Sequence, residues 1–148
     1  LEPKPQQAKI PLMIGGGGEQ RTLKIAAQYA DEWNVWGDAQ ILRHKMNILD
    51  QHCESAGRDP HEIERSAVAL LFLSDNEKYL NKIRAAELAS PAIIGNVSEV
   101  IEIVSTLKEI GVKELIIPDF TLGTLIGADT VKQDLMEKFI TEVAAKIS

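Results

Sequence analysis

The sequence has little of what marks several large classes of protein. Its single cysteine, Cys53, excludes a disulfide within the chain, so we expect a reducing, cytoplasmic compartment. No apolar run approaches the length of a bilayer span, and no segment has a signal-peptide pattern. Lys and Arg total 16 against 22 Asp and Glu, the net charge is −6, and the cationic residues are scattered. We therefore expect neither a nucleic acid nor a membrane surface as a partner.

Histidine is also scarce, and its spacing does not favour a metal site. His44 and His52 lie about two turns apart on one predicted helix, too far to share an ion without other ligands. No His-x3-His or Cys-x2-Cys pair is present, so we expect surface histidines, a buried Cys53 and no metal. No serine stands in an elbow sequence, which leaves no Ser/His/Asp triad to compose.

The 148 residues suit one domain with a proper core. Residues 1–8 contain two prolines and two glutamines, and we expect an extended linker there, before a domain over 9–148. The first residue is Leu1 rather than Met, from which we expect a piece of a longer protein.

Four strands alternate with helices along the chain. Hydrophobic patterning predicts strands at 9–14, 31–36, 66–73 and 113–118, and helices at 19–29, 39–56, 76–88, 98–110 and 130–147, with a loop at 90–96. Ser98 either caps its helix or lies in the first turn. Four strand–helix units call for an α/β fold with parallel strands. A TIM-type barrel takes about 250 residues, so the chain suits half of one, and an open flavodoxin-like sheet fits the count equally.

Four consecutive glycines follow the first predicted strand and precede the first predicted helix. Residues without a Cβ let a ligand approach the main chain, and the helix N-terminus attracts an anion. Arg21 and Thr22 add a guanidinium and a hydroxyl suited to phosphate oxygens. The pattern predicts a phosphate-binding loop; the alternative is a tight turn with no ligand. It is neither a Rossmann fingerprint nor a Walker loop, since the acidic residue and the Gly-Lys-Ser/Thr that these need are missing.

Three phrases, at residues 11–18, 22–34 and 94–100, resemble the C-terminal part of the luciferase-like flavin and deazaflavin oxidoreductases, and residues 107–117 resemble their penultimate helix and last strand. The resemblance implies a TIM-type barrel that holds FMN or the deazaflavin coenzyme at the C-terminal ends of its strands. It also implies that the loop after the fifth strand receives the cofactor phosphate. The residues to which this role falls are Gly15, Gly16, Gly17, Gly18, Glu19, Gln20, Arg21 and Thr22. Glu19 suits a phosphate only if its carboxylate points away or its backbone N–H alone is used.

Two further residues follow predicted strands and are candidates for binding substrate at the barrel rim. Trp36 ends the second strand, where it either stacks on a ring or packs in the core, and Asp119 follows the fourth, where it binds substrate or ends the strand. Hydride transfer is done by the cofactor, so a missing nucleophile does not argue against an oxidoreductase.

The N-terminal half of such a barrel, which lines much of the flavin and substrate pocket, has no counterpart here. A lone half-barrel exposes two strand edges and an apolar sheet face, so we expect self-association and no catalysis by this chain alone. Two other functions fit the glycine run: a non-catalytic α/β module for a phosphorylated ligand, and part of another phosphate-binding barrel enzyme such as an isomerase or aldolase.

Overall fold

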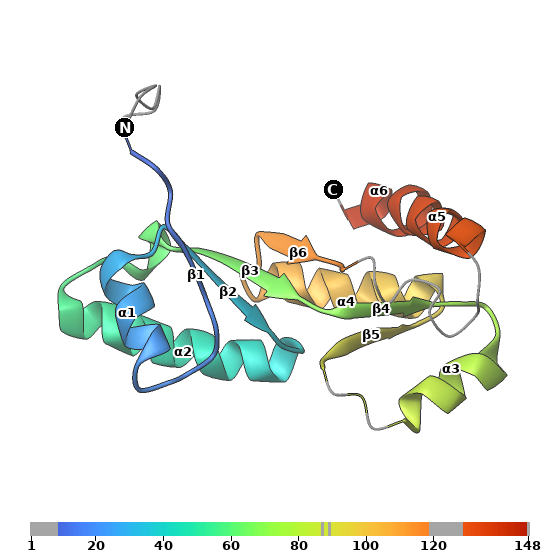
Figure 1. The fold of residues 1–148 in the computed structure, drawn as a ribbon, viewed down its shortest axis with the longest axis horizontal. Helices are drawn as coiled ribbons and strands as arrows, with labels where there is room; N and C mark the ends of the chain where they lie inside the picture. The colour runs from blue at the N-terminus through green and yellow to red at the C-terminus, as the bar shows by residue number, and fades with distance from the viewer. Residues whose placement is uncertain (1–8, 87, 89, 119–128, 148) are drawn as a thin grey trace.

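The computed structural model describes residues 9–86, 88, 90–118 and 129–147, in which strands and helices alternate (Figure 1). The strands are β1 (Met13–Gly15), β2 (Glu32–Trp36), β3 (Glu64–Val68), β4 (Leu70–Leu73), β5 (Ala92–Gly95) and β6 (Glu114–Ile116). The helices are α1 (Thr22–Tyr29), α2 (Ala39–Ala56), the 3-10 turn η1 (Pro60–Glu62), α3 (Glu77–Arg84), α4 (Val97–Glu109), α5 (Asp129–Lys138), the π-helical segment η3 (Phe139–Ala144) and α6 (Ala145–Ile147). The expected linker at 1–8 lies outside the described residues.

The strands form two parallel sheets, one in the order β1-β2-β3-β6 and one of β4 and β5. This confirms the prediction of an α/β fold built as part of a TIM-type barrel. Among the described strands, β1 and β6 each have one neighbour, so both outer edges of the larger sheet are open.

The single strand predicted at 66–73 is divided at Ala69, because its hydrogen-bonding partner changes there. β3 pairs with β2 and β6, whereas β4 pairs with β5. The amide of Ala69 donates to the carbonyl of Ile116, and the next amide, Leu70, donates to Pro91. The two strands still follow one another in one direction across the molecule (Figure 1).

The predicted loop at 90–96 was wrong, because β5 lies within it. Pro91 precedes this four-residue strand and Gly95 ends it, and such turn signals concealed a strand this short. The amides of Leu70 and Ser74 donate to Pro91 and Gly95, so both ends of β5 are tied to the β4 segment.

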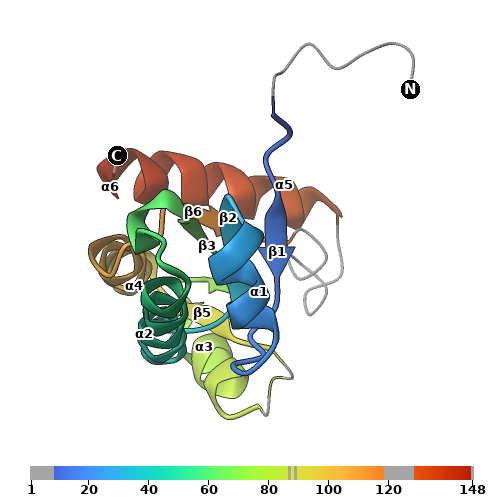
Figure 2. The ribbon, with the colours of Figure 1, turned by 90° about the vertical axis from the view of Figure 1, so that its left-hand side faces the viewer.

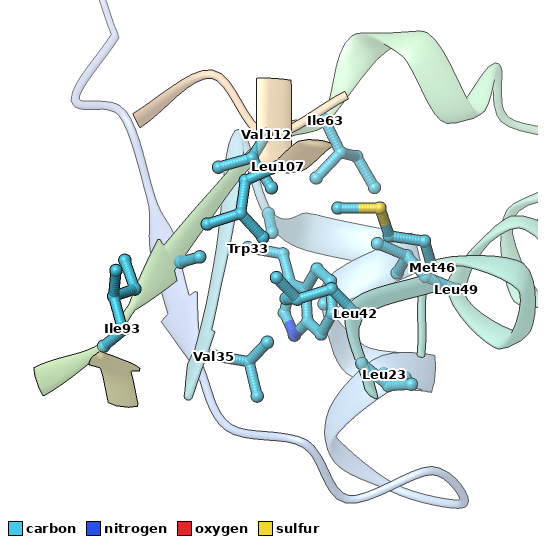
Figure 3. Packing of buried hydrophobic residues seen from close by; sticks show 14 of the residues in the cluster. Leu23, Trp33, Val35, Leu42, Met46, Leu49, Ile63, Ile93, Leu107 and Val112 are labelled. Carbon is cyan, nitrogen blue, oxygen red and sulfur yellow. The ribbon is translucent and has the colours of Figure 1, made fainter. Parts of the chain in front are cut away.

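One face of the larger sheet packs against helices. In Figure 1, α2 lies below β1 and β2 with α1 beside them, whereas the C-terminal helix lies toward the other end of the molecule, where it contacts α4; in Figure 2 it runs behind β1. Trp33 is fully buried at the centre of the cluster and lies close to Leu42 of α2 (Figure 3). On α2, the residues Leu42, Met46, Leu49 and Cys53 follow a 4-3-4 spacing and are buried, whereas Ala56, the next residue of that spacing, is exposed.

The opposite face of the sheet carries the alternate residues of each strand, which in a closed barrel point inward. Asn34 and Ser66 are partners in register there, and the Asn34 side-chain amide donates to the Ser66 hydroxyl at 2.8 Å. Met13 on β1 is 50% exposed and Trp36 on β2 is 37% exposed. This face is thus polar at Asn34 and Ser66 and exposes apolar side chains at Met13 of the edge strand β1 and at Trp36 at the end of β2.

Within the described part of the chain, no helix has both the length and the apolar character of a membrane span.

Candidate functional site

The glycine loop, residues 15–18, leaves the C-terminal end of β1 and leads into α1. Two hydrogen bonds fix its beginning. The Gly16 amide donates to the Asn34 carbonyl at 2.8 Å, and the Trp33 indole N–H donates to the Gly16 carbonyl at 2.9 Å. Both partners belong to β2, so the strand next to β1 holds the first turn of the loop.

The fold itself requires glycine at several positions of this loop, whether or not a ligand binds there. Gly16 has φ = +120°, a conformation that side chains rarely adopt. A Cβ at Gly17 would lie 3.2 Å from a Val35 methyl, and one at Gly18 would lie 2.8 Å from the Thr22 hydroxyl. The tight-turn interpretation therefore explains much of the run, and the case for a ligand depends on the backbone donors.

Those donors are free over most of the loop. Among the described residues, Gly16 commits its amide to a carbonyl, whereas the backbone N–H groups of residues 17–21 donate no hydrogen bond. Arg21, the N-cap residue of α1, makes no side-chain capping bond. Unpaired amides and an uncapped helix N-terminus provide convergent donors for an anion.

A hollow of about 520 Å³ adjoins the loop. Its lining residues come from the end of β1, the glycine loop, β2 and α2, and they are Gly15, Gly16, Gly17, Asn34, Val35, Trp36 and Lys45. Trp36 thus lies beside the loop at the end of β2, where its aromatic face is accessible. Asp119, the other substrate-binding candidate, lies outside the described residues.

Glu19 is turned toward α2. Its Oε1 lies 2.5 Å from Lys45 Nζ and 3.2 Å from His44 Nε2, while its main-chain oxygen lies 2.9 Å from His52 Nε2. The hydrogen bond from Lys45 is the main cause that lowers the pKa of Glu19. Its negative charge is thus held against the ammonium group of Lys45 on the neighbouring helix.

The remaining residues named from the sequence lie at the start of α1 with fewer contacts. Gln20 and Arg21 are exposed, and Thr22 is half-buried with its hydroxyl over Gly18. The hollow therefore brings Gly15, Gly16 and Gly17 together with Trp36, whereas Gly18, Glu19, Gln20, Arg21 and Thr22 do not line it.

Sequence analysis missed Asn34 and Lys45. Asn34 is a polar residue between two buried ones in β2, and Lys45 lies beside the buried stripe of α2, three residues after Leu42. Alternation and helical periodicity place each residue on a face, but neither pattern shows that both faces meet at the glycine loop. Within the described residues, no three His, Cys, Asp or Glu side chains are grouped to hold a metal ion.

Comparison with known proteins shows a match to one protein family. The family model described as luciferase-like monooxygenase matches residues 1–90. No curated protein matches the chain.

Solved structures share the fold at low identity. The coenzyme F420 dependent tetrahydromethanopterin reductase from Methanopyrus kandleri has a TM-score of 0.69 at 17% identity, over 94% of this chain and 51% of that one. The long-chain alkane monooxygenase LadA has a TM-score of 0.64 at 13% identity, over 91% and 40%. An F420-dependent secondary alcohol dehydrogenase, in complex with an F420-acetone adduct, has a TM-score of 0.61 at 16% identity, over 77% and 44%. The chain spans about half the length of these proteins or less.

Proposed function

The chain belongs to the luciferase-like monooxygenase family, and from that premise we propose that it forms the cofactor-phosphate end of an FMN- or deazaflavin-dependent oxidoreductase. The observation that carries the proposal is the run of unpaired backbone N–H groups at residues 17–21, which opens beside a hollow at the C-terminal ends of parallel strands. Ligands in parallel α/β barrels bind at that end. Two of the similar structures are F420-dependent enzymes, and the structure of riboflavin lyase (RcaE), also similar to this chain, contains a modified FMN.

The residues present fit a phosphate group. Free amides at a helix N-terminus suit a doubly charged anion, and Arg21 adds a guanidinium beside them. Trp36, at the other side of the hollow, offers an apolar face of the kind on which a flavin ring or a substrate stacks. When bound, the cofactor supplies hydride transfer or oxygen chemistry, and the protein supplies position and electrostatics.

We propose that this chain does not catalyse the reaction alone. Ile10, Leu12 and Met13 are exposed along the β1 edge, which has one neighbour among the described strands. An open apolar edge favours association with further strands or with a second copy. Light scattering should show an assembly, and a monodisperse monomer that turns over a flavin substrate would contradict the proposal.

Titration with FMN, riboflavin and inorganic phosphate tests the cofactor assignment. FMN should bind, with its fluorescence quenched, and riboflavin should bind more weakly because it lacks the phosphate. Phosphate binding without any FMN binding would instead favour the non-catalytic module or another phosphate-binding barrel enzyme.

The same titration with Arg21→Ala tests the loop. Loss of a charge-assisted contact should weaken FMN binding by about 1.5–3 kcal/mol. The fold should be unaffected because the side chain of Arg21 is exposed. An unchanged affinity would support the tight-turn interpretation of the glycine run.

A further inference from the structure

We propose that Lys45 of α2 is the cation that binds the phosphate in the glycine loop, and that Glu19 holds this lysine until the phosphate displaces it. The inference rests on the proposed function and deepens it, since it names an anion-binding residue and a competitor within the same site.

Lys45 reaches the loop from the middle of α2. It lines the hollow together with Gly15, Gly16 and Gly17, and its side chain is 20% exposed. A Cβ at Gly17 would lie 3.6 Å from Lys45 Cε, so the aliphatic end of the side chain lies next to this glycine. The ammonium group is therefore beside the unpaired N–H groups that begin at Gly17.

Lys45 is the cationic residue among the described residues that line the hollow, whereas Arg21 is exposed at the helix start. The Lys45 stem packs along the protein, so less side-chain entropy is lost when its ammonium meets an anion. Both observations favour Lys45 as the stronger contact.

The ion pair with Glu19 sets the condition for binding. Lys45 Nζ donates to Glu19 Oε1 at 2.5 Å, and the two charges cancel. A phosphate near the same ammonium is repelled by the Glu19 carboxylate and competes with it for the donors of Lys45. His44, at 3.2 Å from the same oxygen, remains as a partner for Glu19 after the exchange.

Four proteins test the exchange: the full chain, Lys45→Met, Glu19→Gln and the double variant. Each is titrated with inorganic phosphate and with FMN while the amide resonances of Gly17 and Gly18 are followed by NMR. Lys45→Met should weaken both affinities at least as much as Arg21→Ala does, about tenfold or more, because a charge-assisted hydrogen bond is lost. Glu19→Gln should strengthen them several-fold, roughly the effect of one nearby charge.

The double variant separates competition from simple repulsion. If Glu19 acts by occupying Lys45, Glu19→Gln should have little effect once Lys45 is Met. An equal gain in both backgrounds would overturn the exchange. Lys24→Met is the matched control, because Lys24 is an exposed lysine of α1 that does not line the hollow. The Lys24→Met variant should bind inorganic phosphate and FMN with nearly the same affinity as the unmodified chain.

The outcomes distinguish this inference from the cofactor assignment. FMN binding that is insensitive to Lys45→Met overturns the inference and leaves the assignment standing. Phosphate binding that depends on Lys45, without FMN binding, supports the inference and overturns the assignment. If neither ligand shifts the two glycine resonances, both are wrong. Should Lys45→Met fail to fold, Lys45→Gln and Glu19→Gln give the same comparison.

Discussion

The indole N–H of Trp33 donates to the carbonyl oxygen of Gly16 at 2.9 Å, which connects the centre of the hydrophobic core to the first turn of the glycine loop. The Gly16 amide is held by Asn34, the next residue along the same strand. The Asn34 carbonyl and the Trp33 indole, both on β2, thus restrain the backbone amide and the backbone carbonyl of Gly16. The donors that follow at residues 17–21 start from a restrained position, which reduces the entropy lost when a ligand binds.

Trp33→Phe should lower the free energy of unfolding by about 1–3 kcal/mol, because the substitution removes a hydrogen bond and leaves unfilled volume in the core. The measurement is urea unfolding, with the Gly16 amide resonance as a local probe of the loop. That resonance should shift because the carbonyl of the same residue loses its partner.

The matched control is Trp36→Phe, at a position that is 37% exposed on the same strand. Its effect on the free energy of unfolding should stay within about 0.5 kcal/mol, as is usual for exposed positions. Equal effects of the two substitutions would mean that the Trp33–Gly16 hydrogen bond does not anchor the loop.

Gly16→Asn should be more destabilising than Gly57→Asn. Gly57 has φ = +68°, in the left-handed region that asparagine adopts, and a Cβ there would meet nothing within 4 Å. Gly16 has φ = +120°, outside that region, so a side chain there costs about 1–3 kcal/mol. Urea midpoints of the two variants give the comparison, and equal midpoints would contradict a conformational requirement at Gly16.

The sequence predicted the helices well because each carries a strong local signal. Asp38 is a residue type typical of helix caps, and its side chain accepts from the Ile41 amide at 2.8 Å at the start of α2. For Ser98 the sequence allowed two positions, the cap or the first turn of its helix. Ser98 lies in the first turn of α4, and Asn96 is the cap, with Glu99 completing a capping box. Two polar residues separated by Val97 compete for one cap, and the choice depends on where β5 ends, which the sequence did not reveal.

The strands and the site were predicted less completely, because their physical cause lies between elements. The division of the strand at Ala69 reflects a change of partner, and no local pattern records the partner. The glycine loop was found because its signal is contiguous. Lys45 was not, because its relevance depends on how α2 packs next to the loop.

The stability that Asp31 contributes should depend on pH. Its carboxylate accepts hydrogen bonds from Lys9 Nζ and from the Leu12 amide, which ties the segment before β1 to the start of β2. Two hydrogen bonds lower the pKa of Asp31 below its usual 3.8. The bond from Lys9 has the largest effect, and the bond from the Leu12 amide has the next largest.

A pKa that is lower in the folded state than in the unfolded state means that the unfolded chain binds the proton first. The contribution is therefore fully present above pH 3.8 and is lost as the pH falls through the lower, folded pKa. Asp31→Asn keeps an acceptor but removes the charge. The difference in urea midpoint between the unmodified chain and this variant should be constant near neutral pH and should shrink below 3.8.

Lys9→Met provides the internal control, since it removes the largest cause of the shift and leaves the carboxylate and the Leu12 amide in place. In that variant the pKa of Asp31, followed by carboxyl NMR, should move up toward 3.8, and the loss of stability should begin at a higher pH. Other carboxylates with lowered pKa values, Glu19 and Asp59, contribute equally to both proteins and cancel in the difference. If Asp31 titrates at the same pH with and without Lys9, Lys9 does not lower this pKa, and the segment before β1 is held through the hydrogen bonds of Leu12.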